Sequence, residues 1–296
     1  MTTSTRVTRL AAVAMSVPDP EATSCFLSEG LGFTVSRGDD GTWHVTCPGE
    51  YGLPSPSSML DLHPAAGGEQ GAKLEEVCFD VDGDLVLEEL RRRLRERGVA
   101  EQRDPFRTTA GVRFADPNGV RVWCGTTGPS VDGTLSPAMV RPRRLGHVNL
   151  TVADAGLSAR FFADVLGLRL SEQIGEAFYF LRVGSEHHNL GIRSGGPVPG
   201  AHHLGFEVHG WETYRILCDH LAALGHKVEY GPGRHGPGGN LFVYVRDPSS
   251  GLRLELYSDM AHIFDEARYV PPRWELSDRG NTVNRWGPGP PESFLE

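Results

Sequence analysis

Hydrophobic and polar residues alternate along residues 201–208, and this pattern predicts a short β-strand because neighbouring side chains of a strand point to opposite faces. A histidine pair opens the run. Alternation places His202 on one face with Leu204, Phe206 and Val208, which we expect to pack on a helix layer, and His203 on the other face. The periodicity alone does not decide which histidine has a function.

The same succession of patterns occurs in both halves of the chain. Residues 9–33 and 144–168 each read as a strand followed by a helix, and they align without a gap at an offset of 135, so that Leu10 matches Leu145. The next strand repeats at an offset of 127, where residues 77–81 match 204–208. This internal duplication predicts two related domains.

Each half continues in the same way. We expect helices over residues 85–98 and 211–225, each closed by a glycine suited to a left-handed C-cap. Hairpin-like strand pairs follow over residues 112–123 and 242–255, where Asp-Pro and a later glycine provide the turn. Strand, helix and several strands therefore occur twice per half, which predicts an α+β fold of four βαβββ modules.

The domain bounds follow from this repeat. Residues 1–125 form the first predicted domain, and residues 126–143, rich in Gly, Ser, Thr and Pro, form a linker. Residues 144–260 form the second domain. Residues 261–296 have little periodicity, and we expect this tail to pack against the second domain near its site.

Composition narrows the functional classes. The chain has 296 residues and a formal net charge of -9, without a basic run, which argues against a nucleic-acid partner. No apolar run approaches the roughly 20 residues that cross a bilayer, and no signal-type segment is evident, so we expect no membrane partner and a cytoplasmic location. The five cysteines are scattered and never form a CxxC pair, as expected for reduced thiols.

The candidate metal-ligating residues lie in the second half of the chain. Of twelve histidines, only two precede residue 147. Aligning the halves sets His147 against Ala12, His203 against Glu76 and Glu255 against Trp123. A single histidine at a strand edge is more often structural, but three such differences together make a metal-ligand set.

Two imidazoles and one carboxylate leave three positions of an octahedral ion open, which suits Fe(II) that binds a bidentate substrate and a small molecule together. Mn(II) fits the same donors. Zinc fits less well, because its sites close at four ligands or keep one open place.

Several motifs in the second half resemble those of a known family. They are Leu-Gly-His-Val at residues 145–148, His-His-Leu-Gly-Phe at 202–206, Arg-His-Gly at 234–236, Tyr244, and Asp-Pro-Ser at 247–249 leading to Glu255. The chain resembles the type I extradiol ring-cleaving dioxygenases of the vicinal oxygen chelate superfamily, over both halves and the tail. The resemblance implies two tandem domains with open, barrel-like mixed sheets, and a first domain without metal ligands.

The resemblance also implies roles for individual residues. It selects the second histidine of the pair, so that His147, His203 and Glu255 are the expected metal ligands. His188 has the spacing of the family histidine that handles protons and oxygen, with His187 as the competing choice. His235 and Tyr244, nine residues apart, match the pair that hydrogen-bonds substrate oxygens. The turn at residues 249–251 is one residue longer than the family's, and we expect a bulge to absorb it.

The implied activity is cleavage of a catecholic ring with O₂, at an Fe(II) centre, to a ring-opened semialdehyde. A metal-dependent isomerase or lyase of the same superfamily, a non-enzymatic resistance-type binding protein and a 4-hydroxyphenylpyruvate-type oxygenase are the alternatives. We expect aromatic and apolar pocket walls from Phe178, Tyr179, Phe180, Leu190 and the tail. The resemblance to this family, in which oligomers are common, also implies a homo-oligomer.

Overall fold

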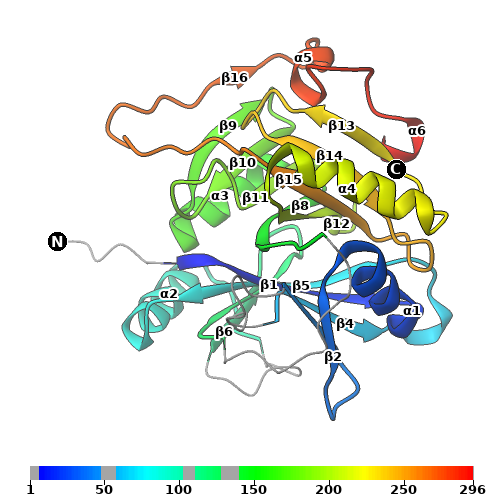
Figure 1. Ribbon diagram of the computed structural model, residues 1–296. Coiled ribbons are helices and arrows are strands. Elements are labelled where there is room, and N and C mark those ends of the chain that lie inside the picture. The colour runs from blue at the N-terminus through cyan, green and yellow to red at the C-terminus, as the bar shows by residue number, and fades with distance from the viewer. Residues whose placement is uncertain (1–6, 48–57, 103–110, 128–139, 296) are drawn as a thin grey trace.

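A computed structural model describes residues 7–47, 58–102, 111–127 and 140–295 (Figure 1). The two halves form two sheets, drawn in blue to cyan and in green to red, that lie against each other (Figure 1). The predicted α+β architecture of two tandem domains with mixed sheets is confirmed.

The first sheet has seven strands in the order β2-β3-β4-β1-β5-β7-β6. Its strands are β1 (Val7–Val17), β2 (Thr34–Arg37), β3 (Trp43–Thr46), β4 (Leu60–Pro64), β5 (Lys73–Val81), β6 (Gly111–Ala115) and β7 (Arg121–Gly125). Its helices are α1 (Pro20–Cys25), continued by the π-helical turn η1 (Phe26–Gly30), then the 3₁₀ turn η3 (Ala66–Gly68) and α2 (Asp84–Glu96).

The second sheet has nine strands in the order β13-β14-β15-β12-β8-β11-β10-β9-β16. Its strands are β8 (Arg144–Val152), β9 (Arg169–Ile174), β10 (Phe178–Arg182), β11 (Leu190–Ser194), β12 (Gly200–Glu207), β13 (Tyr230–Arg234), β14 (Leu241–Arg246), β15 (Arg253–Ser258) and β16 (Arg273–Trp274). The helices are α3 (Ala155–Leu166), α4 (Gly210–Ala223), α5 (Arg279–Val283) and α6 (Glu292–Leu295).

Strand registers show that the duplication extends to individual residues. Ala12 of β1 pairs with Cys78 of β5, as His147 of β8 pairs with Gly205 of β12. Cys78 pairs in turn with Trp123, as Gly205 pairs with Glu255. The residues aligned from the sequence therefore occupy equivalent places in the two sheets.

Helix ends follow from local chemistry. The Asp19 and Asp154 side chains accept hydrogen bonds from the backbone N–H groups of Ala22 (3.0 Å) and Leu157 (2.9 Å), which caps α1 and α3. Gly98 and Gly225, beyond α2 and α4, have positive φ angles of 67° and 80°, as expected of left-handed helix stops.

One hydrophobic core joins the domains. Its buried side chains come from both sheets, and the Phe33 and Phe206 rings meet at 4.7 Å between centroids. The Thr23 hydroxyl also donates to Asp247 across the boundary at 2.7 Å. The second sheet is therefore held by packing against the first as well as by its own helices.

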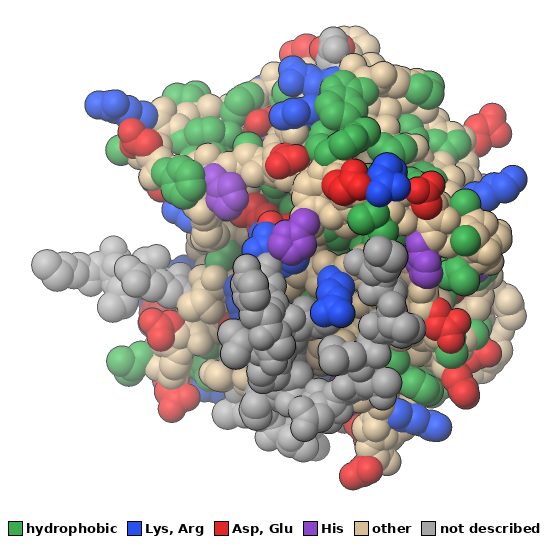
Figure 2. All heavy atoms as spheres, viewed as in Figure 1, with side chains coloured by type: hydrophobic (Ala, Val, Ile, Leu, Met, Phe, Trp, Pro, Cys, Tyr) green, Lys and Arg blue, Asp and Glu red, His purple; other side chains and the backbone are tan. Residues whose placement is uncertain are grey.

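The predicted linker falls largely on residues 128–139, outside the described residues, and the predicted domain bounds stay a prediction. None of the described helices is both long and apolar enough to cross a membrane. On the face drawn in Figure 2, acidic and basic side chains are interspersed with apolar ones.

The tail crosses the second sheet (orange to red in Figure 1). Its short strand β16 pairs with β9, and Phe294 near its end packs against Tyr230 and Tyr244. The tail thus adds an edge strand beside β9 and packs against β13 and β14 at the other end of the second sheet.

Candidate metal centre and its cavity

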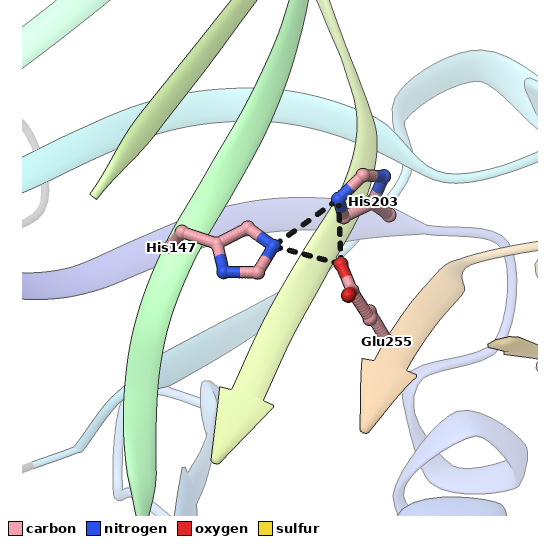
Figure 3. Close-up of side chains that lie close together, drawn as sticks. All are labelled: His147, His203 and Glu255. Carbon is pink, nitrogen blue, oxygen red and sulfur yellow. Dashed lines mark hydrogen bonds and ion pairs between the residues drawn. The ribbon is translucent and has the colours of Figure 1, made fainter. Parts of the chain in front are cut away.

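Three adjacent strands direct His147, His203 and Glu255 to one point (Figure 3). His147 Nε2 lies 2.8 Å and His203 Nε2 lies 3.1 Å from Glu255 Oε2, and the two nitrogens are 3.3 Å apart. All three side chains are buried. Three donor atoms this close, inside the protein, match the two-histidine, one-carboxylate set of a metal site.

Gly205 makes room for this convergence. A Cβ atom at this position would lie 2.1 Å from the His147 ring. Any side chain at residue 205 would therefore displace His147, so the glycine of the His-His-Leu-Gly motif is a steric requirement of the site.

The site electrostatics favour a cation. Burial would raise the pKa of the Glu255 carboxyl, but the neighbouring His147, together with His203 and His235, holds that pKa well below its usual value. Burial lowers the pKa of His203 to about 4, although Glu255 opposes the shift. An ionised carboxylate beside a neutral imidazole is the protonation state that metal ligation needs.

A hydrogen-bond chain fixes the His203 tautomer. The Phe294 carbonyl can only accept, so His202 Nε2, 2.8 Å away, carries the proton of that bond. Neutral His202 then accepts at Nδ1 from His203 Nδ1, 2.8 Å away. This leaves the lone pair of His203 on Nε2, which faces Glu255 and His147.

A hydrogen bond from Asn240 to the second carboxylate oxygen orients Glu255. Asn240 donates its side-chain N–H to Glu255 Oε1 at 2.9 Å, while Oε2 faces the two histidines. Tyr244 pairs with Glu255 across β14 and β15 in unbroken register. The extra residue at 249–251 therefore lies in the turn, and the expected bulge is absent.

His235 and Tyr244, predicted as a pair, are in contact. His235 donates from Nδ1 to the Val283 carbonyl at 2.6 Å, and in that tautomer its Nε2 accepts from the Tyr244 hydroxyl at 3.0 Å. Burial and the nearby Glu255 carboxylate raise the pKa of Tyr244 well above its usual value. The phenol therefore stays protonated as a hydrogen-bond donor.

His188, and not His187, lines the cavity beside the triad. Its ring lies 4.5 Å from the His147 ring between centroids, and burial lowers its pKa well below the usual value, with the His147 charge second. His187 Nδ1 lies 2.9 Å from His188 Nδ1, and its Nε2 lies 3.3 Å from Glu172 without forming a hydrogen bond. Trp274 of the tail donates to the same carboxylate at 2.5 Å.

A cavity of about 590 Å³ opens over these residues. Its walls come from β8–β12, β14, β15 and the tail, and include Phe178, Phe180, Leu276, Val283 and Phe294. Two side chains expected in the wall are elsewhere: Tyr179 and Leu190 pack in the hydrophobic core. Strand alternation explains this, because Phe178 and Phe180 share the opposite face of β10 from Tyr179.

The expectation for His202 was also wrong. It does not join Leu204 on the helix side but lines the cavity and contacts His203. The cause is a register shift in β12 between Ala201 and His203, which breaks the regular alternation.

Sequence reasoning also missed Asn149, Arg193 and Asn240 in the cavity wall. Alternation from His147 could have found Asn149, two residues further on the same face of β8. Asn240 precedes a strand in a glycine-rich loop, where no periodicity signals its direction.

The two domains share one strand order. Among the described residues, the second domain has a cluster of two histidines and one carboxylate. Together these features define a metal-binding protein with a glyoxalase-like fold. The family model described as "Glyoxalase/Bleomycin resistance protein/Dioxygenase superfamily" matches residues 9–124 and 144–256. The chain belongs to this superfamily.

Comparison with individual proteins shows similarity to ring-cleaving dioxygenases. The chain is 31% identical to metapyrocatechase 2 of Cupriavidus necator over 74% of this chain and 72% of the relative. It is 27% identical to biphenyl-2,3-diol 1,2-dioxygenase of Paraburkholderia xenovorans over 93% of each. The fold resembles homoprotocatechuate 2,3-dioxygenase of Arthrobacter globiformis with a TM-score of 0.84 at 23% identity, covering 99% of this chain and 92% of that one. The predicted relation to extradiol dioxygenases is confirmed.

Proposed function

We propose that the protein is an Fe(II)-dependent extradiol dioxygenase that opens a catecholic ring with O₂ to a semialdehyde, with His147, His203 and Glu255 as metal ligands. The observation that carries this proposal is the convergence of three ligand atoms within 4.8 Å, where His203 and Glu255 line a cavity with aromatic sides. Mn(II) accepts the same donors. Bound metal would supply the electron path between a chelated catecholate and oxygen.

The surrounding residues suit this reaction. Phe178 and Phe180, whose rings stack at 4.4 Å, offer an apolar wall that packs against an aromatic ring and excludes water. Tyr244 and His235 stand where they can hold a substrate oxygen by hydrogen bonds. His188, kept neutral by its burial, has the lone pair needed to take a proton from the substrate and return it later.

The test is anaerobic loading of the metal-free chain with Fe(II) or Mn(II), followed by a panel of catechols under air. We expect oxygen uptake together with a yellow ring-opened product, and neither signal from Glu255→Ala. A protein with one equivalent of bound metal that consumes no oxygen with any catechol would contradict the proposal. The predicted homo-oligomer and cytoplasmic location stay predictions, for size-exclusion chromatography and cell fractionation to test.

A further inference from the structure

Arg193 brings a positive charge to the wall of the cavity. It lies on β11, paired in register with Thr151 of β8 and Phe178 of β10. Its Nε donates to the Thr151 hydroxyl at 2.9 Å. This bond orients the guanidinium, and its terminal nitrogens remain for another acceptor.

No carboxylate among the described residues forms an ion pair with Arg193. Burial lowers its pKa, and the only other contribution comes from the like charge of Arg253, which is itself bonded to Glu229 at 2.7 Å and 3.0 Å. A half-buried guanidinium without a counter-charge costs free energy. A ligand that brings an anionic group to this wall would remove that cost.

The strand geometry sets the distance between this charge and the metal centre. His147 and Thr151 are four residues apart on β8, so they share a face, with about 13 Å between their Cα atoms. Arg193 lies beside Thr151, and the stacked Phe178 and Phe180 rings lie next to it on β10. A plain catechol would leave the Arg193 end of the 590 Å³ cavity unfilled.

We propose that the substrate is a catecholic acid whose carboxylate, carried on a short side chain of the ring, binds the Arg193 guanidinium. The inference rests on the proposed function, since the two ring hydroxyls would lie at the triad and the carboxylate at the opposite end. Arg193 is then the residue that selects a charged substrate over a neutral one. A guanidinium holds a carboxylate by charge-assisted hydrogen bonds that an uncharged substituent cannot make.

The first test measures a selectivity ratio, kcat/KM for 3,4-dihydroxyphenylacetate divided by kcat/KM for 4-methylcatechol. Loss of one charged hydrogen-bonding partner corresponds to roughly a ten- to hundredfold change. We expect Arg193→Met to lower the ratio by at least tenfold and Arg193→Lys to lower it less. A smaller fall in Arg193→Met overturns the inference.

The matched control is Arg215→Met, which removes the same charge from the exposed face of α4, where Arg215 pairs with Glu212. Its selectivity ratio should equal that of the unmodified protein. An equal fall in both variants would attribute the effect to net charge and would overturn the role of Arg193.

The second test separates this inference from the proposed function. Equilibrium dialysis under nitrogen compares phenylacetate with the neutral phenylacetamide, neither of which has ring hydroxyls or can be cleaved. The metal-loaded full chain should bind the acid at least tenfold more tightly than the amide, and Arg193→Met should remove that preference. If no catechol is opened but this preference is found, the proposed reaction fails while the anion site stands; without the preference, the anion site fails.

Discussion

Equivalent positions in the two sheets have opposite occupants. In the first sheet Trp123, buried to 1% exposure, packs with Ala12 and Cys78 and fills the place where the second sheet directs its three donor atoms. In the second sheet the same register positions hold His147, Gly205 and Glu255. One fold thus supports either a packed apolar cluster or a polar site, depending on three side chains.

The charges differ in the same way. The first domain has Glu76 where the second has His203, and Arg113 where the second has Tyr244. Arg113 bonds Glu76 in a buried pair, with Nη2 2.8 Å from Oε2, so the carboxylate is neutralised within the protein. In the second domain the Glu255 charge faces two imidazoles. The second site therefore favours a cation from outside the chain.

Replacing one of the proposed metal ligands should have the largest effect, which is loss of the metal from the second domain. His147→Ala, His203→Ala or Glu255→Ala should each abolish iron retention, because two remaining donors do not hold the ion against buffer. Metal content after gel filtration, measured by mass spectrometry, checks this. His44→Ala, which removes a first-domain histidine bonded to Asp61, should keep its iron. Full iron content in His203→Ala would refute the ligand assignment.

The next prediction concerns His188, whose counterpart in the first domain is Ser58. The two are equivalent because the following residues, Asn189 and Met59, bond β8 and β1 in the same way. His188→Phe should leave iron bound and slow turnover by roughly 10²- to 10⁴-fold, the usual contribution of general acid–base catalysis. Stopped-flow turnover with a parallel iron assay measures both. Unchanged turnover would leave His188 a wall residue only.

The third prediction tests the buried pair of the first domain. Arg113→Leu leaves Glu76 as an unpaired buried charge and should lower the free energy of unfolding by about 3–5 kcal/mol. The double variant Arg113→Leu with Glu76→Leu should recover most of that loss. Urea denaturation gives both values. Equal destabilisation in the single and double variants would show that packing, and not charge, sets the cost.

The smallest change in unfolding free energy is expected from the helix N-caps that the two domains share. Asp19→Ala and Asp154→Ala each remove a helix N-cap and should cost about 1 kcal/mol of unfolding free energy. Because the two caps have the same geometry, we expect equal losses within about 0.5 kcal/mol. Urea denaturation again provides the measurement, and a twofold difference between the variants would show that the domains depend unequally on these caps.

Much of the fold was predictable because the same sequence pattern occurs in both halves of the chain. The ungapped match of residues 9–33 with 144–168 identified equivalent strands without any contact information, and the registers of Ala12 and His147 agree with it. Helix stops were predictable from Gly98 and Gly225, since their backbone angles exclude most other residues. β16 has no counterpart among the described strands of the first sheet, and the place of β13 is taken there by an isolated bridge between Gln102 and Arg113, so neither strand was predictable from the repeat.

The site was predictable only in part. Residues distinguished by type, such as His147 and Glu255, could be found by comparing the halves. His202 could not be placed, because a local register shift changes which way a side chain points without changing the sequence pattern. Arg193 reads as an ordinary strand arginine until its uncompensated charge in the cavity wall is seen.

The route of the tail has a consequence for the order in which the protein matures. The three converging donors are present once Glu255 has been synthesised, but the His202 bond that orients His203 waits for Phe294. The wall residues Leu276, Val283 and Phe294 also come after the last donor. Because synthesis runs from the N-terminus to the C-terminus, the residues that orient His203 and enclose the cavity join the chain after the last of the proposed metal ligands.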